Sequence, residues 1–81
     1  MPVVLRVGGF SFTIYPDDHD PPHVHVRSGG ARVILGIESD EERDVHGMSH
    51  VEVWRAQRVV RDYRDALLNA WFEIKAREKG R

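Results

Sequence analysis

Apolar and polar residues alternate along the first half of the chain, in two stretches that each surround a pair of glycines. In the first stretch, the apolar positions on either side of Gly8-Gly9 are Val3, Leu5, Val7, Phe10, Phe12 and Ile14. Because successive side chains of a strand point to opposite faces, this pattern predicts a β-hairpin with one buried face. Segment 16–22 contains three prolines and is predicted to be a loop, since proline cannot donate to a strand ladder.

The second alternating stretch covers residues 23–37 and predicts a second hairpin, with Gly29-Gly30 at its turn. The cross-strand pairs that follow are Arg27 with Arg32, Val26 with Val33, His25 with Ile34, and Val24 with Leu35. One face then supplies core residues, and the opposite face carries His23, His25, Arg27 and Arg32. Two arginines directly across a strand pair repel each other unless an anion or a carboxylate lies between them.

The C-terminal part of the chain predicts a long helix. Ser49 and Glu52 form a capping box, which is a sequence signature of a helix start, and Gly80 is a stop signal. Apolar residues then recur at steps of three and four, at Val53, Ala56, Val60, Tyr63, Leu67, Ala70 and Ile74. A helix over residues 50–78 would be roughly 43 Å long, against about 17–20 Å for a strand. One end therefore overhangs the sheet, unless the helix breaks, for which the region of Asn69 is the expected position.

These patterns predict one α+β domain over residues 1–81. Its small antiparallel sheet has four to five strands, which form two β-hairpins within about residues 2–37 and pack against one long C-terminal helix over about residues 50–78. The acidic run ESDEERD lies in a connecting loop, residues 38–47, which can also hold a short fifth strand around residues 43–46. At 81 residues the chain has a modest core, so contacts with a partner can add to its stability.

Composition excludes several classes of site. The chain has no cysteine, which removes disulfides, thiolate nucleophiles and cysteine zinc sites. Its net charge of −1 does not favour nucleic-acid binding through overall charge. No apolar run is long enough to cross a bilayer, and the N-terminal residues lack the pattern of a signal peptide, so we expect a cytoplasmic protein without membrane contact.

Potential chemistry is concentrated in the segment DHDPPHVHV, residues 18–26. His23 and His25 lie on one side of a strand about 7 Å apart, and Asp18 or His19 can approach them from the preceding loop. One interpretation is a site for zinc or nickel in which His19, or alternatively Asp18, completes a ligand set with His23 and His25. Such binding would weaken below about pH 6, where free imidazoles are protonated.

Two other interpretations of this segment need no metal. His23 and His25 can act as an acid–base pair on a phosphate ester, with Arg27 or Arg32 holding the phosphate. Alternatively, the histidines only form hydrogen bonds with the backbone of an irregular loop. The sequence leaves the three interpretations open.

The stretch IYPDDHDPPHVHV resembles the signature of a bacterial family, domain of unknown function 4160, with its D-H-x-P-P-H-x-H-V core. The later stretch YRDALLNAW is similar to the corresponding part of that family. The matching positions are Asp18, His19, Pro21, Pro22, His23, His25 and Trp71. The resemblance implies a small protein that is often encoded beside another small protein, in a pair of the toxin–antitoxin type, and it implies no specific activity.

Two functional hypotheses follow, and whether the protein is an enzyme stays open. In the first, the protein is a protein-binding component of such a gene pair, and its partner is the neighbouring gene product or a second copy. The C-terminal half of the helix is apolar over more than half its circumference, which predicts an interface at Leu68, Trp71 and Phe72, with Trp71 also facing the core. In the second, the protein is a small phosphoesterase or ribonuclease-like toxin that uses His23, His25 and Arg27. The apolar helix end favours the first hypothesis slightly.

Overall fold

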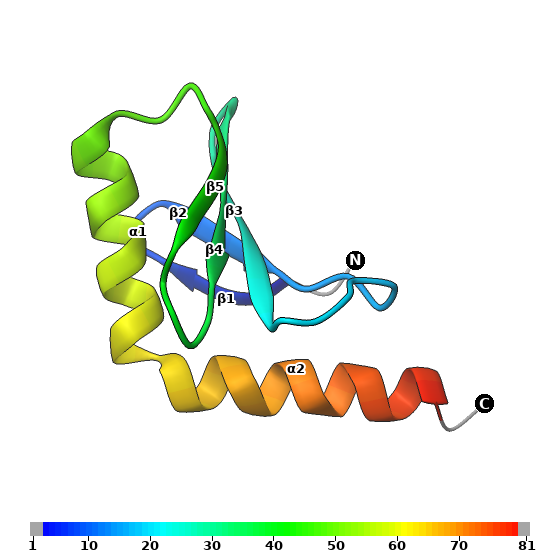
Figure 1. The fold of residues 1–81 in the computed structure, drawn as a ribbon. Coiled ribbons are helices and arrows are strands. Elements are labelled where there is room, and N and C mark those ends of the chain that lie inside the picture. Colours follow the sequence, from blue (N-terminus) through cyan, green and yellow to red (C-terminus); the bar gives the residue numbers. More distant parts are fainter. Residues whose placement is uncertain (1–2, 80–81) are drawn as a thin grey trace.

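The computed structural model describes residues 3–79 and consists of one five-stranded antiparallel sheet followed by two helices (Figure 1). The strands lie in the sheet in chain order: β1 (Val3–Val7), β2 (Phe10–Thr13), β3 (His23–Ser28), β4 (Ala31–Gly36) and β5 (Glu42–His46). The helices are α1 (His50–Asp62) and α2 (Arg64–Lys79). The predicted α+β class is confirmed. Residue 2 and Gly80, a predicted strand start and helix stop, lie outside the described residues.

Both predicted hairpins form, with the glycine pairs at their turns. Gly8, Gly9 and Gly29 have φ values of +58°, +84° and +59°, which side-chain-bearing residues rarely adopt. The register of β3 and β4 is the predicted one, with Arg27 opposite Arg32. β5 confirms the short fifth strand predicted around residues 43–46, and its pairing with β4 is irregular between Arg32 and Ile34 of β4.

The core lies between one face of the sheet and the helices. This closed face carries residues such as Val24, Val26, Val33 and Leu35, which are fully buried together with Ala56 and Val60 of α1. The other face, which we call the open face, carries His25, Arg27 and Arg32. Figure 1 shows α1 along one side of the sheet, and within residues 3–79 no helix lies over the open face.

The C-terminal segment is helical as predicted, but it forms two helices instead of one. Tyr63 separates them, with φ −112° and ψ 21°, and the helices meet at a sharp corner (Figure 1). With 13 residues, α1 spans about 20 Å, which matches the length of a strand. The break precedes Asn69 and directs α2 along the end of the sheet, where Leu67 and Trp71 are each only 1% exposed. Neither helix combines the length and hydropathy of a membrane span.

Contacts with the loop between β4 and β5 hold the corner in place. Asp40 Oδ2 lies 3.0 Å from Arg61 Nε of α1 and 3.7 Å from Arg64 Nη2 of α2. Arg64 Nε donates to the carbonyl oxygen of Ile37 at 2.9 Å, and Gln57 Nε2 donates to that of Asp40 at 2.9 Å. Part of the acidic run therefore has partners within the chain.

Candidate functional site

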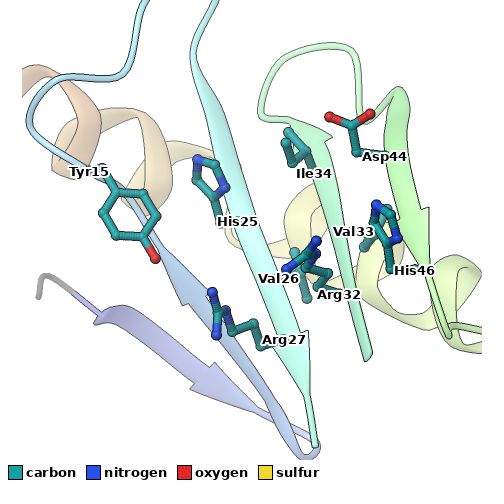
Figure 2. Close-up of a pocket in the computed structure, with 9 residues that line it drawn as sticks. All are labelled: Tyr15, His25, Val26, Arg27, Arg32, Val33, Ile34, Asp44 and His46. Atoms are coloured by element: carbon teal, nitrogen blue, oxygen red, sulfur yellow. The ribbon is translucent and has the colours of Figure 1, made fainter. Parts of the chain in front are cut away.

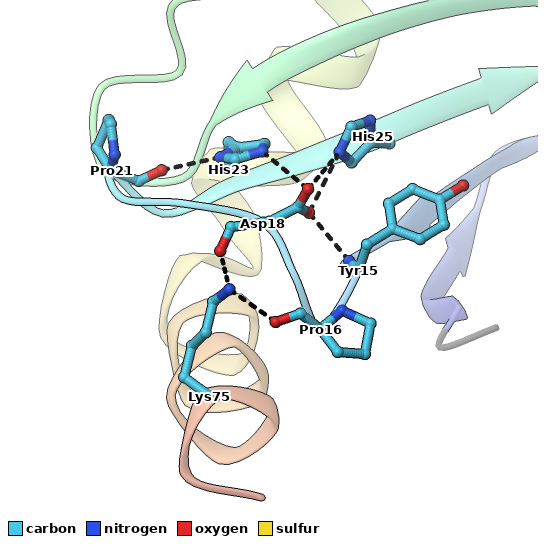
Figure 3. Close-up of polar contacts among 7 residues, drawn as sticks. All are labelled: Tyr15, Pro16, Asp18, Pro21, His23, His25 and Lys75. Carbon is cyan, nitrogen blue, oxygen red and sulfur yellow. Dashed lines mark hydrogen bonds and ion pairs between the residues drawn. The ribbon is translucent and has the colours of Figure 1, made fainter. Parts of the chain in front are cut away.

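The loop between β2 and β3 is fixed by its own turn and by a lysine from α2 (Figure 3). The Asp18 N–H donates to the carbonyl oxygen of Tyr15 at 3.0 Å, and the Tyr15 N–H donates to Asp18 Oδ2 at 3.0 Å. Lys75 Nζ donates to the carbonyl oxygens of Pro16, at 3.0 Å, and of Asp18. The Asp18 carboxylate is therefore positioned by contacts that involve segments far apart in the sequence.

Asp18 lies between the side chains of His23 and His25 (Figure 3). His25 Nε2 is 3.2 Å from Asp18 Oδ2, and His23 Nε2 is 3.6 Å from Asp18 Oδ1. The exposed fractions of the side chains are 14% for Asp18, 10% for His23 and 26% for His25. The three groups form a cluster that is largely shielded from water and has its most accessible member in His25.

His23 is held on both sides of its ring. Its Nδ1 lies 2.9 Å from the carbonyl oxygen of Pro21. Because a carbonyl oxygen can only accept, Nδ1 carries a hydrogen, and in the neutral ring Nε2 then has a free lone pair. The ring also packs against Trp71, with 5.3 Å between ring centroids. His23 is thereby fixed with Nε2 directed toward Asp18.

A row of polar and cationic side chains crosses the open face beside this cluster. The register aligns one residue from each strand: Arg6, Ser11, Arg27, Arg32 and His46. Within residues 3–79, neither Arg27 nor Arg32 forms a salt bridge with a carboxylate. Since facing guanidinium groups repel each other, the centre of this row favours an anion.

A cavity of about 260 Å³ lies over this part of the open face (Figure 2). Strands β3, β4 and β5 and the loop after β2 supply its polar lining. These residues are His25 and Arg27 of β3, Arg32 of β4, Asp44 and His46 of β5, and Tyr15 of the loop. Asp44 supplies the one carboxylate of this lining. His25 belongs both to the Asp18 cluster and to the cavity, so it connects the two.

The structure brings together most of the residues that the sequence singled out. His23 and His25 lie close to Asp18, as predicted, and Arg27 and Arg32 line the adjacent cavity. His19 is exposed and lies outside the cluster, so Asp18 is the one of the two candidate loop residues that lies beside the histidines. Metal binding itself stays a prediction.

The two motif prolines have backbone roles. The Pro21 carbonyl oxygen accepts from His23, and the Pro22 carbonyl oxygen accepts from the Ile37 N–H at 3.0 Å. These bonds tie the end of the loop to its own strand and to the residue that follows β4. The prolines therefore shape the site without contributing side-chain chemistry.

Sequence reasoning missed Tyr15, His46 and Lys75. The Tyr15 ring lies 4.8 Å from the His25 ring, centroid to centroid, and His46 lines the same cavity as His25. The short predicted fifth strand includes His46, but its irregular pairing with β4 means that the partner of His46, Arg32, does not follow from the sequence. Lys75 is 57 residues from Asp18, and no local pattern indicates their contact.

The three residues predicted to form an interface, Leu68, Trp71 and Phe72, differ in how far they are buried. Trp71 is 1% exposed within this chain, which confirms its predicted place in the core, whereas its part in an interface stays a prediction. Leu68 is partly buried against the core. Phe72 is 60% exposed, because it lies about 100° further around α2 than Trp71. The expected apolar patch is thus reduced mainly to Phe72.

Comparison with known proteins identifies the family. The sequence model described as "Domain of unknown function (DUF4160)" matches residues 9–72. This match covers most of the chain, which therefore belongs to that family. No curated protein and no solved structure matches the chain.

Proposed function

We propose that this protein binds and hydrolyses a phosphate ester on the open face of its sheet. The observation that carries the proposal is the position of His25, which contacts Asp18 and also lines the cavity that contains Arg27 and Arg32. A carboxylate–imidazole pair beside two guanidinium groups combines an acid–base group with an anion site. The second motif histidine, His23, supports Asp18 from the other side.

The arginines are suited to hold the phosphate. They face each other across β3 and β4 without a carboxylate partner among the described residues, so a bound phosphate would relieve their repulsion. Arginine also recognises phosphate oxygens through two parallel N–H groups. Because the net charge of the chain is −1, binding would depend on this local site and not on a general attraction to polyanions.

His25 is suited to act as the general base. If its Nε2–H donates to Asp18, its Nδ1 is free to accept a proton from an attacking water. The water oxygen then bonds to phosphorus while the bond to the leaving oxygen breaks, and that oxygen takes up a proton, for which His46 in the same cavity is the candidate donor. A phosphodiester of the RNA backbone is the substrate class, as in a ribonuclease-like toxin.

A second candidate function is binding of a partner protein in a toxin–antitoxin-like gene pair in the cytoplasm. The observation that favours it is the exposure of aromatic side chains on both helices, with Trp54 51% and Phe72 60% exposed. The partner would be the product of a neighbouring gene or a second copy of this chain. This function is compatible with hydrolysis, since a partner could control access to the open face.

Hydrolysis of bis(p-nitrophenyl) phosphate and of a short RNA by the purified chain tests the main proposal. We expect His25→Gln to lower the rate by roughly 100-fold or more, the usual contribution of a general base. Arg27→Ala and Arg32→Ala should mainly weaken substrate binding. Arg55→Ala and His50→Gln, which change exposed residues of α1, serve as matched controls and should keep the rate.

Absence of hydrolysis by the wild-type chain, with and without added divalent metal, would contradict the proposal. So would a rate that survives His25→Gln unchanged. Far-UV circular dichroism of each variant shows whether a lost rate reflects lost folding.

A further inference from the structure

We infer that Asp18, His23 and His25 form a binding site for a divalent transition-metal ion, with zinc as the best fit. Each residue offers one ligand atom, and the three atoms lie within 4.8 Å of one another. With metal–ligand bonds of about 2.0–2.1 Å, ligands on a tetrahedron are about 3.3 Å apart. Asp18 Oδ1 lies 3.3 Å from His25 Nε2 and 3.6 Å from His23 Nε2, and both distances are close to this value.

The hydrogen bond of His23 gives an independent reason for a cation at this position. Since Nδ1 donates to Pro21, the Nε2 of a neutral His23 directs its lone pair at the negatively charged Asp18 carboxylate. Two electron-rich atoms 3.6 Å apart repel each other unless a cation lies between them. A metal ion at this position would also be bound by His25 Nε2, which lies 3.2 Å from Asp18 Oδ2.

The surroundings of the cluster resemble the outer shell of a metal site. Metal-binding histidines almost always donate their other ring N–H to a carbonyl or carboxylate, as His23 does to Pro21. Asp18 Oδ2 accepts from the Tyr15 N–H, and Lys75 holds the Asp18 carbonyl oxygen. The ligands are therefore oriented before any metal arrives, which reduces the entropic cost of binding.

Two imidazoles and one carboxylate leave a coordination position for water, as in catalytic zinc sites. A second cavity, of about 330 Å³, borders Asp18 and His23, and its other lining includes Asp17, Asp20, His19 and Arg43. The two additional carboxylates outweigh the one guanidinium and favour a cation near the cluster. No cysteine is available, so nitrogen and oxygen ligands select zinc or nickel over softer ions.

What the metal does rests on the proposed function, although its binding does not. A zinc-bound water loses its proton near neutral pH, so the metal would replace His25 as the group that generates the nucleophile. The oxygen of that water bonds to phosphorus as the bond to the leaving alcohol breaks, and the alcohol takes up the proton. Arg27 and Arg32 keep the role of holding the phosphate.

Calorimetric titration of zinc chloride into the untagged, chelator-treated chain tests the site. We expect one zinc per chain, and an affinity at least about 100-fold lower in Asp18→Asn and His25→Gln, since even outer-shell partners contribute roughly 10–100-fold. His19→Gln and His50→Gln are the controls and should bind like the wild type. Cobalt(II) should give the intense visible absorption of a tetrahedral site in the wild type and lose it in His25→Gln.

No binding heat together with no zinc-dependent rise in the melting temperature would overturn the inference. Equal loss of affinity in His19→Gln and His25→Gln would also overturn it, because the ligands would then be surface histidines. Zinc binding without phosphoester hydrolysis would retain the metal site and reject the proposed function. Hydrolysis that needs His25 and persists in chelator, together with no zinc binding, would retain the proposed function and reject the metal site.

Discussion

Neighbouring residues of β3 show how different the two faces of the sheet are. Val24 and Val26 point to the closed face and are fully buried, whereas His25 is partly accessible and Arg27 is exposed on the open face. The closed face is filled by aliphatic and aromatic side chains that pack against the helices. The open face brings together Arg27, Arg32 and His46, which contribute little to a core.

This contrast separates stability from function. Burial on the closed face and along α2 supplies the hydrophobic stabilisation of a small domain. Two arginines that face each other across a strand pair lower the stability of the sheet. Destabilising arrangements of this kind are expected mainly at functional sites. A stable closed face therefore allows the open face to hold groups selected for ligand binding.

The largest effect should come from the closed face. Leu35→Ala removes a fully buried side chain of β4 and should lower the free energy of unfolding by about 2–5 kcal/mol. Ile34→Ala changes the preceding residue, which lies on the open face, and should lower the free energy of unfolding by less than about 1 kcal/mol. Urea denaturation followed by circular dichroism measures both. Similar losses in the two variants would show that the open face is also covered, for example by a second copy.

A pair of substitutions on α2 extends the comparison to the proposed interface. Leu68→Glu places a charge against the core and should destabilise the chain by about 1–3 kcal/mol, whereas Phe72→Glu should leave folding nearly unchanged. If Phe72 contacts a second copy, Phe72→Glu should also reduce self-association in sedimentation experiments. If the wild type and Phe72→Glu are both folded and monomeric, a second copy of the chain is no longer a candidate partner.

The smallest effect should appear on the open face. Arg32→Thr removes one of two facing positive charges and should raise the free energy of unfolding by roughly 0.2–1 kcal/mol at low salt. Inorganic phosphate should raise the melting temperature of the wild type more than that of Arg32→Thr. Arg55→Thr on α1 is the control. A loss of stability in Arg32→Thr would indicate that Arg32 has a favourable partner instead of a repelling one.

The sequence predicts the parts of this fold that depend on local periodicity. The register of β3 and β4 follows from Gly29-Gly30 and strict alternation, so the pairing of Arg27 with Arg32 could be predicted from the chain alone. The capping box of Ser49 and Glu52 likewise fixes the start of α1, where both of its hydrogen bonds form. These features need only neighbouring residues.

The corner at Tyr63 and the position of Asp18 depend on contacts between distant segments. Neither proline nor glycine marks the corner; it is held by Asp40, which binds arginines of both helices. The choice of Asp18 over His19 depends on the turn at Tyr15 and on Lys75. Alternation could place His23 and His25 on one face, but it could not indicate which loop residue would meet them.

The central claim is that the open face binds phosphate, and amide chemical shifts of the isotopically labelled chain test it most directly. Titration with dimethyl phosphate, a phosphodiester without a reactive leaving group, should shift the amides around His25, Arg27, Arg32 and His46, and Arg32→Thr should weaken these shifts. Amides of α1 should not move. Shifts confined to the helix arginines, or no saturable shifts on the open face, would contradict the account.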